Sequence, residues 1–421
     1  MKFQSLFLLL FLVQLLNAQN TIKIPQDATS ISAAVQLAAT GDTILLAPGT
    51  YTDSVHISHK HLIFKGDPNG GTVLSPGPNE RSFIVESAIV EFQHLIFDDF
   101  QLNSPPPNFA ISANGSEIKV NKCEFYNFYS PIHVFSSDLE ISHSIFIGNR
   151  GAGGILQNGG TFLTHNNLFY GMRKRVFSIN RAHGYFFNNT LIASGLDAAK
   201  AMTINSDSIT HVFNNIIDGF GIGIYLIASD SSELEALRIY NNNIYDRAAP
   251  YWYEFNEDLG LFFYRGPLIP NPGTGEISSP SNFVDSLNGD FTLQASSPCI
   301  DAGINAFPNT VPYDLSGGVR IVNRIPDIGA YEASNFLSLN EVFASNIFKL
   351  FPVPAKNHVW VDFFEQFSGT LDIIDIKGTI IQRQEIVQKE KLRIDLTVSG
   401  GIYFVRLSNN QSTQVERIVI E

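Results

Sequence analysis

A short pattern recurs through the middle of the chain: a polar residue, two further residues, and then a large apolar residue. The seven pairs are His94/Phe97, Lys122/Phe125, His143/Phe146, Asn166/Phe169, Asn189/Ile192, Asn214/Ile217 and Asn242/Tyr245. Successive polar positions are separated by 28, 21, 23, 23, 25 and 28 residues. Repeats of similar but unequal length are typical of solenoids, in which each repeat contacts only its neighbours. The pattern therefore predicts a stack of coils across this region.

Within each repeat, short segments alternate between apolar and polar residues, and Gly, Asn and Ser turns separate them. Examples are residues 118–120, 139–141 and 185–187, and helical periodicity is absent. Equivalent residues of stacked parallel strands lie about 4.8 Å apart, so aligned apolar residues form an internal ladder. Aligned asparagines bond to the coils above and below, and Asn also suits a left-handed corner. We therefore expect these asparagines to be structural.

The first part of the mature chain reads as a cap followed by a strand. Residues 29–39 have helical spacing, with Gly41 as the stop signal, and the segment from Gly41 to Tyr51 is Gly-Asp-Thr-Ile-Leu-Leu-Ala-Pro-Gly-Thr-Tyr. Together with the Asn-Asn pairs at 166/167, 188/189, 214/215 and 241/242, this opening resembles the right-handed parallel β-helix proteins of the pectate-lyase-like kind. The resemblance covers roughly residues 21–246. It implies an all-β protein with an N-terminal capping helix, and it leaves the activity open because many functions share this scaffold.

Residues 247–332 are predicted to contain the terminal coils and a closing region. The blocks at 297–303, 314–320 and 327–332 resemble the choice-of-anchor Q region of bacterial surface β-helix proteins. This resemblance implies a secreted or tethered protein and names no substrate. Asp301, Asp314, Asp327 and Glu332 lie in Gly-rich turns, where they offer oxygen ligands suited to calcium or cap the turns through the backbone.

Both ends of the chain carry delivery signals. Residues 1–18 read as a signal peptide, with Lys2, an apolar run and a small-residue cleavage site. After a linker at 333–345, residues 346–421 read as short strands of a small β-sandwich and resemble the type IX (Por) secretion C-terminal sorting domain of Bacteroidetes, although Val353 replaces an expected Asn. The resemblance implies type IX secretion machinery as a partner and a secreted or outer-surface location.

Composition narrows the function classes. The 421 residues include 27 basic and 40 acidic residues, a net charge of −13. This balance argues against nucleic-acid binding, which needs a basic face. Cys123 and Cys299 are expected to be buried and unpaired, and the familiar hydrolase, nucleotide and metal motifs are missing. We therefore expect no resident cofactor, apart from calcium if the acids of residues 301–332 bind it.

The phase of the repeat predicts one basic cluster. If the turns keep their phase, side chains seven or eight residues after the polar position gather from three consecutive coils. These predicted catalytic residues are Arg150, Arg173, Lys174 and Asp197. The neighbouring candidates for substrate binding are Arg175, Arg181, His183 and Lys200.

Two classes of function follow. The first is a surface β-helix that binds an extended polysaccharide, acidic or otherwise, without catalysis. The alternative is a lyase acting on a uronate-containing glycan, in which basic groups neutralise the sugar carboxylate and Lys174 or a neighbour removes the adjacent proton. Hydrolysis by a carboxylate pair drawn from Asp197, Asp207 and Asp218 is disfavoured because their repeat phases differ.

Overall fold

The computed structural model describes most of the chain outside its first 18 residues. The described ranges are 19–75, 77, 81–99, 109–149, 154–172, 174–193, 200–205, 209–228, 237–245, 249–257, 260–265, 275–305, 311–333, 348–351, 355–375, 379–396, 398–409 and 413–420. The predicted signal peptide therefore lies outside the described residues. The chain divides into two compact units, residues 1–335 and 336–421, and each is described by itself.

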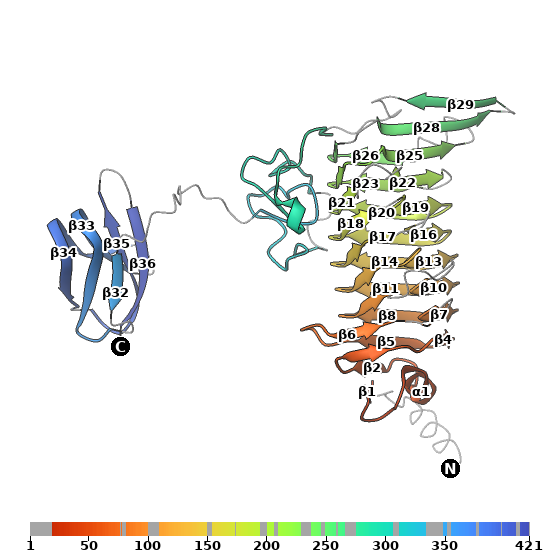
Figure 1. Cartoon of the computed structure of the whole chain (residues 1–421), viewed down its shortest axis with the longest axis horizontal. Coiled ribbons are helices and arrows are strands. Elements are labelled where there is room, and N and C mark those ends of the chain that lie inside the picture. Colours follow the sequence, from red (N-terminus) through yellow and green to blue (C-terminus); the bar gives the residue numbers. More distant parts are fainter. Residues whose placement is uncertain are drawn as a thin grey trace, which may run out of the picture. The chain divides into compact units, whose positions relative to one another are not determined.

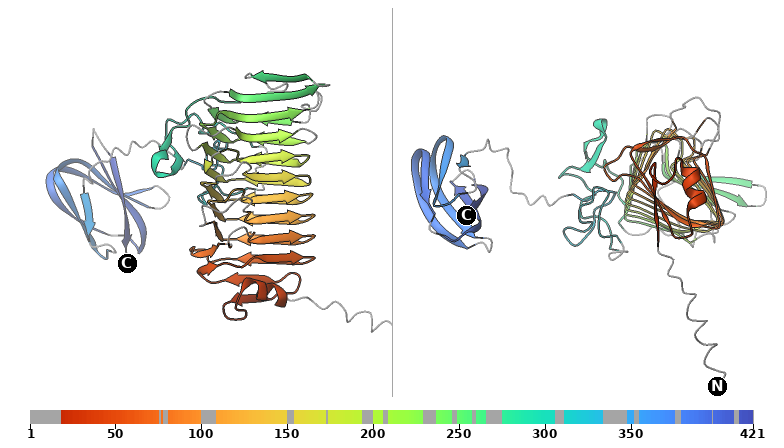
Figure 2. Two further views of the ribbon diagram at one scale, coloured as in Figure 1. Left: turned by 45° about the vertical axis from the view of Figure 1, so that its right-hand side comes forward. Right: turned by 90° about the horizontal axis from the view of Figure 1, so that it is seen from below.

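The first unit is a parallel β-helix, in which the chain passes repeatedly through three sheets (Figures 1 and 2). Sheet A consists of β1 (Thr21–Ile24), β2 (Thr43–Leu46), β5 (His61–Lys65), β8 (Ile89–Gln93), β11 (Glu117–Asn121), β14 (Asp138–Ser142), β17 (Thr161–His165), β20 (His183–Phe187), β23 (Thr210–Phe213) and β26 (Leu237–Tyr240). Sheet B consists of β3 (Gly49–Tyr51), β6 (Thr72–Leu74), β9 (Ile96–Asp98), β12 (Glu124–Tyr126), β15 (Ile145–Ile147), β18 (Leu168–Met172), β21 (Thr190–Ala193), β24 (Ile216–Asp218) and β27 (Asn243–Tyr245).

Sheet C completes each coil. It consists of β4 (Val55–Ser58), β7 (Phe83–Glu86), β10 (Ile111–Asn114), β13 (Ile132–Phe135), β16 (Ile155–Asn158), β19 (Phe177–Asn180), β22 (Lys200–Asn205), β25 (Ile222–Ala228), β28 (Ala249–Glu257) and β29 (Gly260–Arg265). All neighbouring strands in these sheets are parallel except β28 and β29, which form an antiparallel pair at the end of sheet C. The prediction of a parallel β-helix is confirmed.

Apolar ladders fill the interior. Phe97, Phe125, Phe146 and Phe169 are fully buried on successive strands of sheet B. Their rings stack with centroid separations of 4.7, 4.6 and 4.7 Å and interplanar angles of 0°, 2° and 16°. The large apolar member of the first four repeated pairs, from His94/Phe97 to Asn166/Phe169, is therefore the inward residue of sheet B, where stacking with its neighbours excludes water.

Two of the seven predicted pairs are displaced by one residue. In the register of sheet B, Phe169 pairs with Leu191, Leu191 with Ile217, and Ile217 with Ile244. Ile192 and Tyr245 are therefore not the inward residues. Tyr245 is 42% exposed, whereas Ile244 is 1% exposed. The correct pairs are Asn188/Leu191 and Asn241/Ile244. Either asparagine of an Asn-Asn doublet satisfies the sequence pattern, so the pattern does not determine which one is the corner residue. Because side chains alternate between the two faces of a strand, a shift of one residue replaces the inward residue with an outward one.

The corner between sheets A and B uses two adjacent positions for different purposes. The first position adopts the left-handed backbone conformation, with φ between 50° and 55°, in His94, Lys122, His143, Asn166, Asn188, Asn214 and Asn241. The second position points inward and is buried. It holds Cys123, Ser144, Asn167, Asn189, Asn215 and Asn242 on successive coils. Because asparagine tolerates the left-handed conformation and bonds through its amide, the Asn-Asn doublet serves both positions.

The buried asparagines form a continuous hydrogen-bonded ladder. The backbone N–H of Asn167 donates to Oδ1 of Asn189 (3.1 Å), that of Asn189 to Oδ1 of Asn215 (3.0 Å), and that of Asn215 to Oδ1 of Asn242 (3.0 Å). Each Nδ2 donates to the next Oδ1 as well, at 2.9 to 3.1 Å. At the end of the ladder, Oε1 of Glu276 accepts from the backbone N–H and Nδ2 of Asn242 (3.0 and 2.9 Å). The amide groups thus align one coil upon the next.

A single helix covers the first coil, as predicted. Helix α1 (Ile31–Leu37) begins at Ser30, whose side chain accepts the backbone N–H of Ala33, and it buries Ile31, Ala34 and Val35 against the stack. Figure 2 shows the helix lying across the lower end of the coils. At the C-terminal end of the helix, Lys60 donates to the carbonyls of Val35 and Ala38 (2.7 and 2.8 Å). The helix therefore protects the apolar interior that the first coil would otherwise expose.

After β29, the chain returns along the side of the stack. The closing region, residues 275–333, contains β30 (Phe283–Asp285), the 3₁₀ helix η2 (Ser286–Asn288) and β31 (Asp290–Leu293), and it packs beside sheets A and B (Figure 1). It hydrogen-bonds to the corner column: Asn214 exchanges hydrogen bonds with Ile304, and the carbonyl of Tyr313 accepts from Nδ2 of Asn166 (2.6 Å). Corner side chains thus hold this region in place.

The second unit is a five-stranded antiparallel sheet with its own core. Its strands are β32 (Phe348–Phe351), β33 (His358–Asp375), β34 (Ile380–Asp395), β35 (Gly401–Ser408) and β36 (Thr413–Ile420). Asp372 is buried and pairs with Arg383 (2.6 Å) and Arg406. These hydrogen-bonded pairs lower the pKa of Asp372 below its usual value. The small all-β unit predicted after the linker is present, and residues 333–345 and 346–421 stay predictions as domain limits.

The ladder predicts a large cost for losing one buried amide. In Asn215→Ala, the N–H of Asn189 loses its acceptor, and the carbonyls of Phe186 and Phe213 lose the amide donor of Asn215. The carbonyl of Phe213 keeps the backbone N–H of Asn188. Each buried unsatisfied group costs about 1–3 kcal/mol, so we expect the free energy of unfolding to fall by about 3 kcal/mol or more in urea denaturation.

The matched control is Asn180→Ala. Asn180 also belongs to an amide ladder, with Asn158 and Asn205, but this ladder lies on the outer face of sheet C. Water replaces those hydrogen bonds, so a loss of about 1 kcal/mol or less is expected. Equal losses in the two variants would contradict the role assigned to the inner ladder.

Candidate functional site

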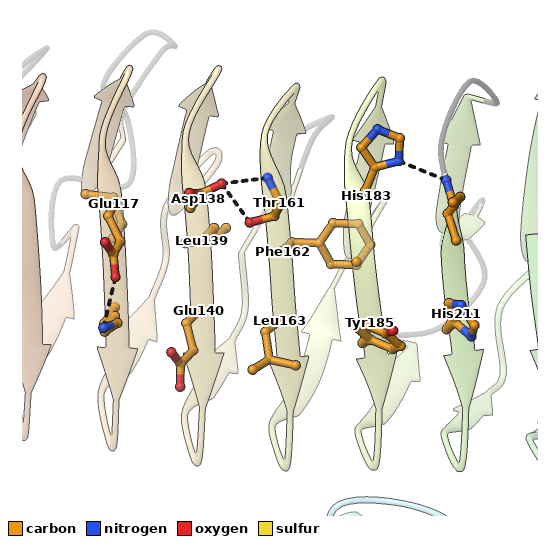
Figure 3. Close-up of a pocket in the computed structure, with 14 residues that line it drawn as sticks. Glu117, Asp138, Leu139, Glu140, Thr161, Phe162, Leu163, His183, Tyr185 and His211 are labelled. Carbon is orange, nitrogen blue, oxygen red and sulfur yellow. Dashed lines mark hydrogen bonds and ion pairs between the residues drawn. The ribbon is translucent and has the colours of Figure 1, made fainter. Parts of the chain in front are cut away.

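The outer face of sheet A carries a groove of about 660 Å³ that runs across several consecutive coils (Figure 3). Because side chains alternate along each strand, every second residue of sheet A points outward. Two columns of outward residues line the groove. The leading column is Glu117, Asp138, Thr161, His183 and Ile209, and the middle column is Lys119, Glu140, Leu163, Tyr185 and His211. The groove is thus a product of the register between coils.

One end of the groove is charged. Nζ of Lys119 forms an ion pair with Oε1 of Glu117 (2.9 Å), and this hydrogen bond raises the pKa of Lys119, with further contributions from the nearby charges of Glu91 and Glu140. The side chain of Glu140, unlike its backbone in β14, makes no hydrogen bond or ion pair with another described residue. Its carboxylate is therefore available to a ligand.

Asp138 and His183 are held by their neighbours on adjacent coils. Oδ1 of Asp138 accepts from the backbone N–H and the hydroxyl of Thr161 (2.9 and 2.6 Å). Nδ1 of His183 accepts from the backbone N–H of Ile209 (3.0 Å), so a neutral imidazole carries its proton on Nε2. Figure 3 shows both contacts along the upper edge of the groove. This edge therefore presents a carboxylate and an N–H donor in fixed positions.

The other end of the groove is aromatic and apolar. The rings of Tyr185 and His211 are stacked, with centroids 4.7 Å apart and an interplanar angle of 28°. Leu163 precedes Tyr185 in the same column, and Ile209 is 57% exposed beside it. Burial, and secondarily the charge of Arg238, lower the pKa of His211, so its ring is neutral at pH 7. This end forms a half-buried platform of two neutral rings.

A third column of sheet A lies beside the groove beneath the closing region. His165, Phe187, Phe213 and Tyr240 stack at centroid separations of 5.1, 4.9 and 5.0 Å. Val311 packs against Phe187 and Phe213, which are each 1% exposed. The closing region therefore covers this column and leaves the middle column open.

The eight predicted site residues lie at two different corners or outside the described residues. Arg150, Arg173 and Asp197 lie outside the described residues. Lys174 is exposed after β18, and its carbonyl accepts the backbone N–H of Lys200 on the next coil (3.0 Å).

Their described neighbours divide between the same corner and the next one. Arg175 contacts Ser178 (3.5 Å), and Nζ of Lys200 lies 3.2 Å from the ring centroid of Tyr225. Arg181 instead lies between β19 and β20, at the corner of sheets C and A, and His183 is the first residue of β20 and lines the groove. The structure brings Lys174 beside Lys200, whereas His183 lies at the start of β20. The catalytic cluster stays a prediction.

The other groove residues were missed, although the sequence carries a signal for them. Each middle-column residue stands three positions before the left-handed corner residue, as Glu140 does before His143, Tyr185 before Asn188 and His211 before Asn214. The sequence hypothesis searched only downstream of the corner. Counting three residues back from each corner residue identifies the middle column, provided that Asn188 and not Asn189 is taken as the corner residue.

The acids of the closing region accept backbone N–H groups. Asp314 accepts from Gly318 and Glu332, Asp327 from Asp301 and Ala333, and Glu332 from Val322 and Asp327. Among the described residues, no group of three or more His, Cys, Asp and Glu side chains is arranged to hold a metal ion. These contacts favour the turn-capping interpretation, and calcium stays a prediction.

Arg320 lies among these acids with almost no exposure. Its Nε is 3.8 Å from Oε2 of Glu332, and both side chains are 3% exposed or less. Burial raises the pKa of Glu332 to about 7, against the opposing effect of Arg320. Cys123 and Cys299 are both buried and unpaired, as expected. The closing region thus reaches a fixed structure through capped turns and one buried cation.

His165 predicts an acid-sensitive contact beneath the closing region. Burial lowers the pKa of its imidazole to about 3, from 6.5 in the unfolded chain. Between these values the unfolded state binds a proton that the folded state does not, so the free energy of unfolding falls as the pH decreases from about 6.5 toward 3. In His165→Phe, which keeps the ring stack on Phe187, we expect a shallower decline in thermal unfolding temperature across this interval. Parallel declines in both proteins would contradict this assignment.

Comparison with known proteins agrees with this architecture. Residues 87–249 match the family model of the right handed beta helix region, and residues 349–421 match that of the secretion system C-terminal sorting domain. No curated protein matches the chain. Among solved structures, a crystal structure of a mutant pectin methylesterase in complex with a hexasaccharide is similar over 66% of this chain and 98% of that chain, with 10% identity and a TM-score of 0.35.

The two family matches and the parallel sheets of the structure define the fold and the destination of the protein. It is a right-handed parallel β-helix, followed by a sorting domain that directs it to type IX secretion machinery. It is therefore secreted or located at the cell surface. In the described part of the chain, no helix is long and apolar enough to cross a membrane.

Proposed function

We propose that this secreted or cell-surface protein binds an extended polysaccharide along the groove of sheet A. The observation that supports this function is the half-buried platform of Tyr185 and His211, continued by Leu163 and bordered by polar groups. A sugar ring has an apolar C–H face and a polar rim of hydroxyl groups. Flat rings beside hydrogen-bonding groups complement both parts of such a ligand.

The direction of the groove suits a polymer. Side chains of the middle column repeat at the coil spacing of about 4.8 Å, which is similar to the length of one sugar unit in an extended chain. A glycan lying along the stack axis meets one outward residue of this column at each sugar. Binding then gains from several weak contacts, each from a different coil, without any activated group.

Two observations favour binding over the uronate-lyase hypothesis. Lys174, the predicted base, is exposed at the corner between sheets B and C and does not line the groove. Among the described residues, three carboxylates line the groove, those of Glu117, Asp138 and Glu140, together with one ammonium, that of Lys119. An elimination mechanism needs the opposite balance, because its basic groups neutralise the carboxylate of the substrate.

The test is removal of one ring of the platform. Tyr185→Ala removes a stacking partner that contributes about 0.5–1.5 kcal/mol beyond its area, so we expect the affinity for a soluble polysaccharide to fall by about three- to ten-fold. Isothermal titration calorimetry or affinity electrophoresis with a panel of soluble polysaccharides measures this change. His211→Ala is expected to have a smaller effect in the same direction.

Tyr129→Ala provides the matched control. Tyr129 is 38% exposed and lies between β12 and β13, away from the groove, so its removal is expected to leave affinity unchanged. Equal losses in Tyr129→Ala and Tyr185→Ala, or no binding to any polysaccharide by the unaltered protein, would refute the proposal. Circular dichroism verifies that each variant keeps its fold.

A further inference from the structure

The charges of the groove define the class of glycan that it accepts. Glu117, Asp138 and Glu140 lie on the outer face of two adjacent strands, β11 and β14, where successive coils are about 4.8 Å apart. Glu91 precedes Lys119 in the middle column and adds a fourth carboxylate beside this end of the groove. The single lysine is already paired with Glu117 at 2.9 Å. Glu91 also lies 3.7 Å from Nε2 of His61, so even with His61 protonated these four carboxylates face only two of the described cations, Lys119 and His61.

The cation at the aromatic end is too distant to balance these acids: Arg238 follows His211 in the middle column and lies four coils from Glu140, about 19 Å at the usual coil spacing. The ring of His211 is neutral at pH 7, and His183 receives the N–H of Ile209 on Nδ1, which a neutral ring provides. No arginine lines the groove among the residues that the structure describes. A bidentate guanidinium contact, the usual partner of a sugar carboxylate, is thus missing from the described lining.

We propose that the groove selects an uncharged polysaccharide and rejects a uronate polymer of the same backbone. This inference rests on the proposed function and adds the substrate class. The carboxylate of Glu140 and Oδ2 of Asp138 accept hydrogen bonds from sugar hydroxyls, because the hydrogen bonds of Asp138 to Thr161 engage its Oδ1. The same carboxylates repel a carboxylate on the ligand. A charged sugar therefore loses affinity at the very positions where a neutral sugar gains hydrogen bonds.

The experiment compares ligands that differ only in charge. Soluble β-glucan and galactomannan are titrated into the full secreted chain, together with the same two polymers after oxidation of their primary alcohols to carboxylates. At low ionic strength we expect at least one neutral polymer to bind about ten-fold or more tightly than its oxidised form. Raising the salt concentration to about 0.5 M should narrow this difference, because screening weakens repulsion between exposed charges.

Removing one groove carboxylate should change the selectivity. In Glu140→Gln we expect the preference for the neutral polymer to shrink about three-fold, mainly through tighter binding of the oxidised form. Glu86→Gln is the control, because Glu86 lies on sheet C beside His56 and its replacement changes the net charge by the same amount. An equal change in both variants would indicate a general charge effect and overturn the inference.

The outcomes separate the two proposals. If the oxidised polymers bind as tightly as the neutral ones, and Tyr185→Ala weakens both, the groove binds glycans and the inferred charge selectivity is wrong. If no polymer binds, the proposed function and the inference both fail. Both proposals are supported if a neutral polymer binds, Tyr185→Ala weakens that binding, and Glu140→Gln reduces the preference for the neutral polymer over its oxidised form.

Discussion

The amide ladder at the corner between sheets A and B determines the rest of this structure. Each buried asparagine accepts a backbone N–H from the coil below and donates to the coil above, so the vertical alignment of the coils is specified by hydrogen bonds as well as by apolar contact. Apolar stacking alone is tolerant of small shifts, whereas a hydrogen bond at 3 Å is not. Because side chains alternate with a period of two, a slip of one residue would exchange the inner and outer faces.

The groove is a direct result of this alignment. Residues such as Glu140, Leu163 and Tyr185 are separated by more than twenty positions in the chain, yet they become neighbours because each stands at the same distance from a corner. None of them belongs to a recognisable sequence motif. In a solenoid, a binding surface is composed of positions from separate repeats, and its chemistry changes gradually from coil to coil. Here it changes from carboxylates to aromatic rings.

The fold could be predicted from the sequence largely because its local signals agree. The repeated polar and apolar pair, the strand alternation and the opening helix all indicated stacked parallel strands, and the register of the structure confirms this. The phase was wrong at Asn189 and Asn242, where either asparagine of a doublet satisfied the pattern. A left-handed φ and an inward amide cannot be distinguished by residue type when both favour asparagine. The groove was not predicted because outward residues carry no packing constraint, and its selection required the correct phase.

The carboxylate of Glu276 gives the amide ladder an end. Each buried asparagine donates its backbone N–H and one hydrogen of Nδ2 toward the next coil, while Nδ2 also donates to a carbonyl of the preceding coil. At Asn242 the donors directed onward meet Oε1 of Glu276 in place of another amide. A negatively charged acceptor completes such a ladder more strongly than another neutral amide. Glu276 belongs to the closing region, so the ladder ends where that region begins.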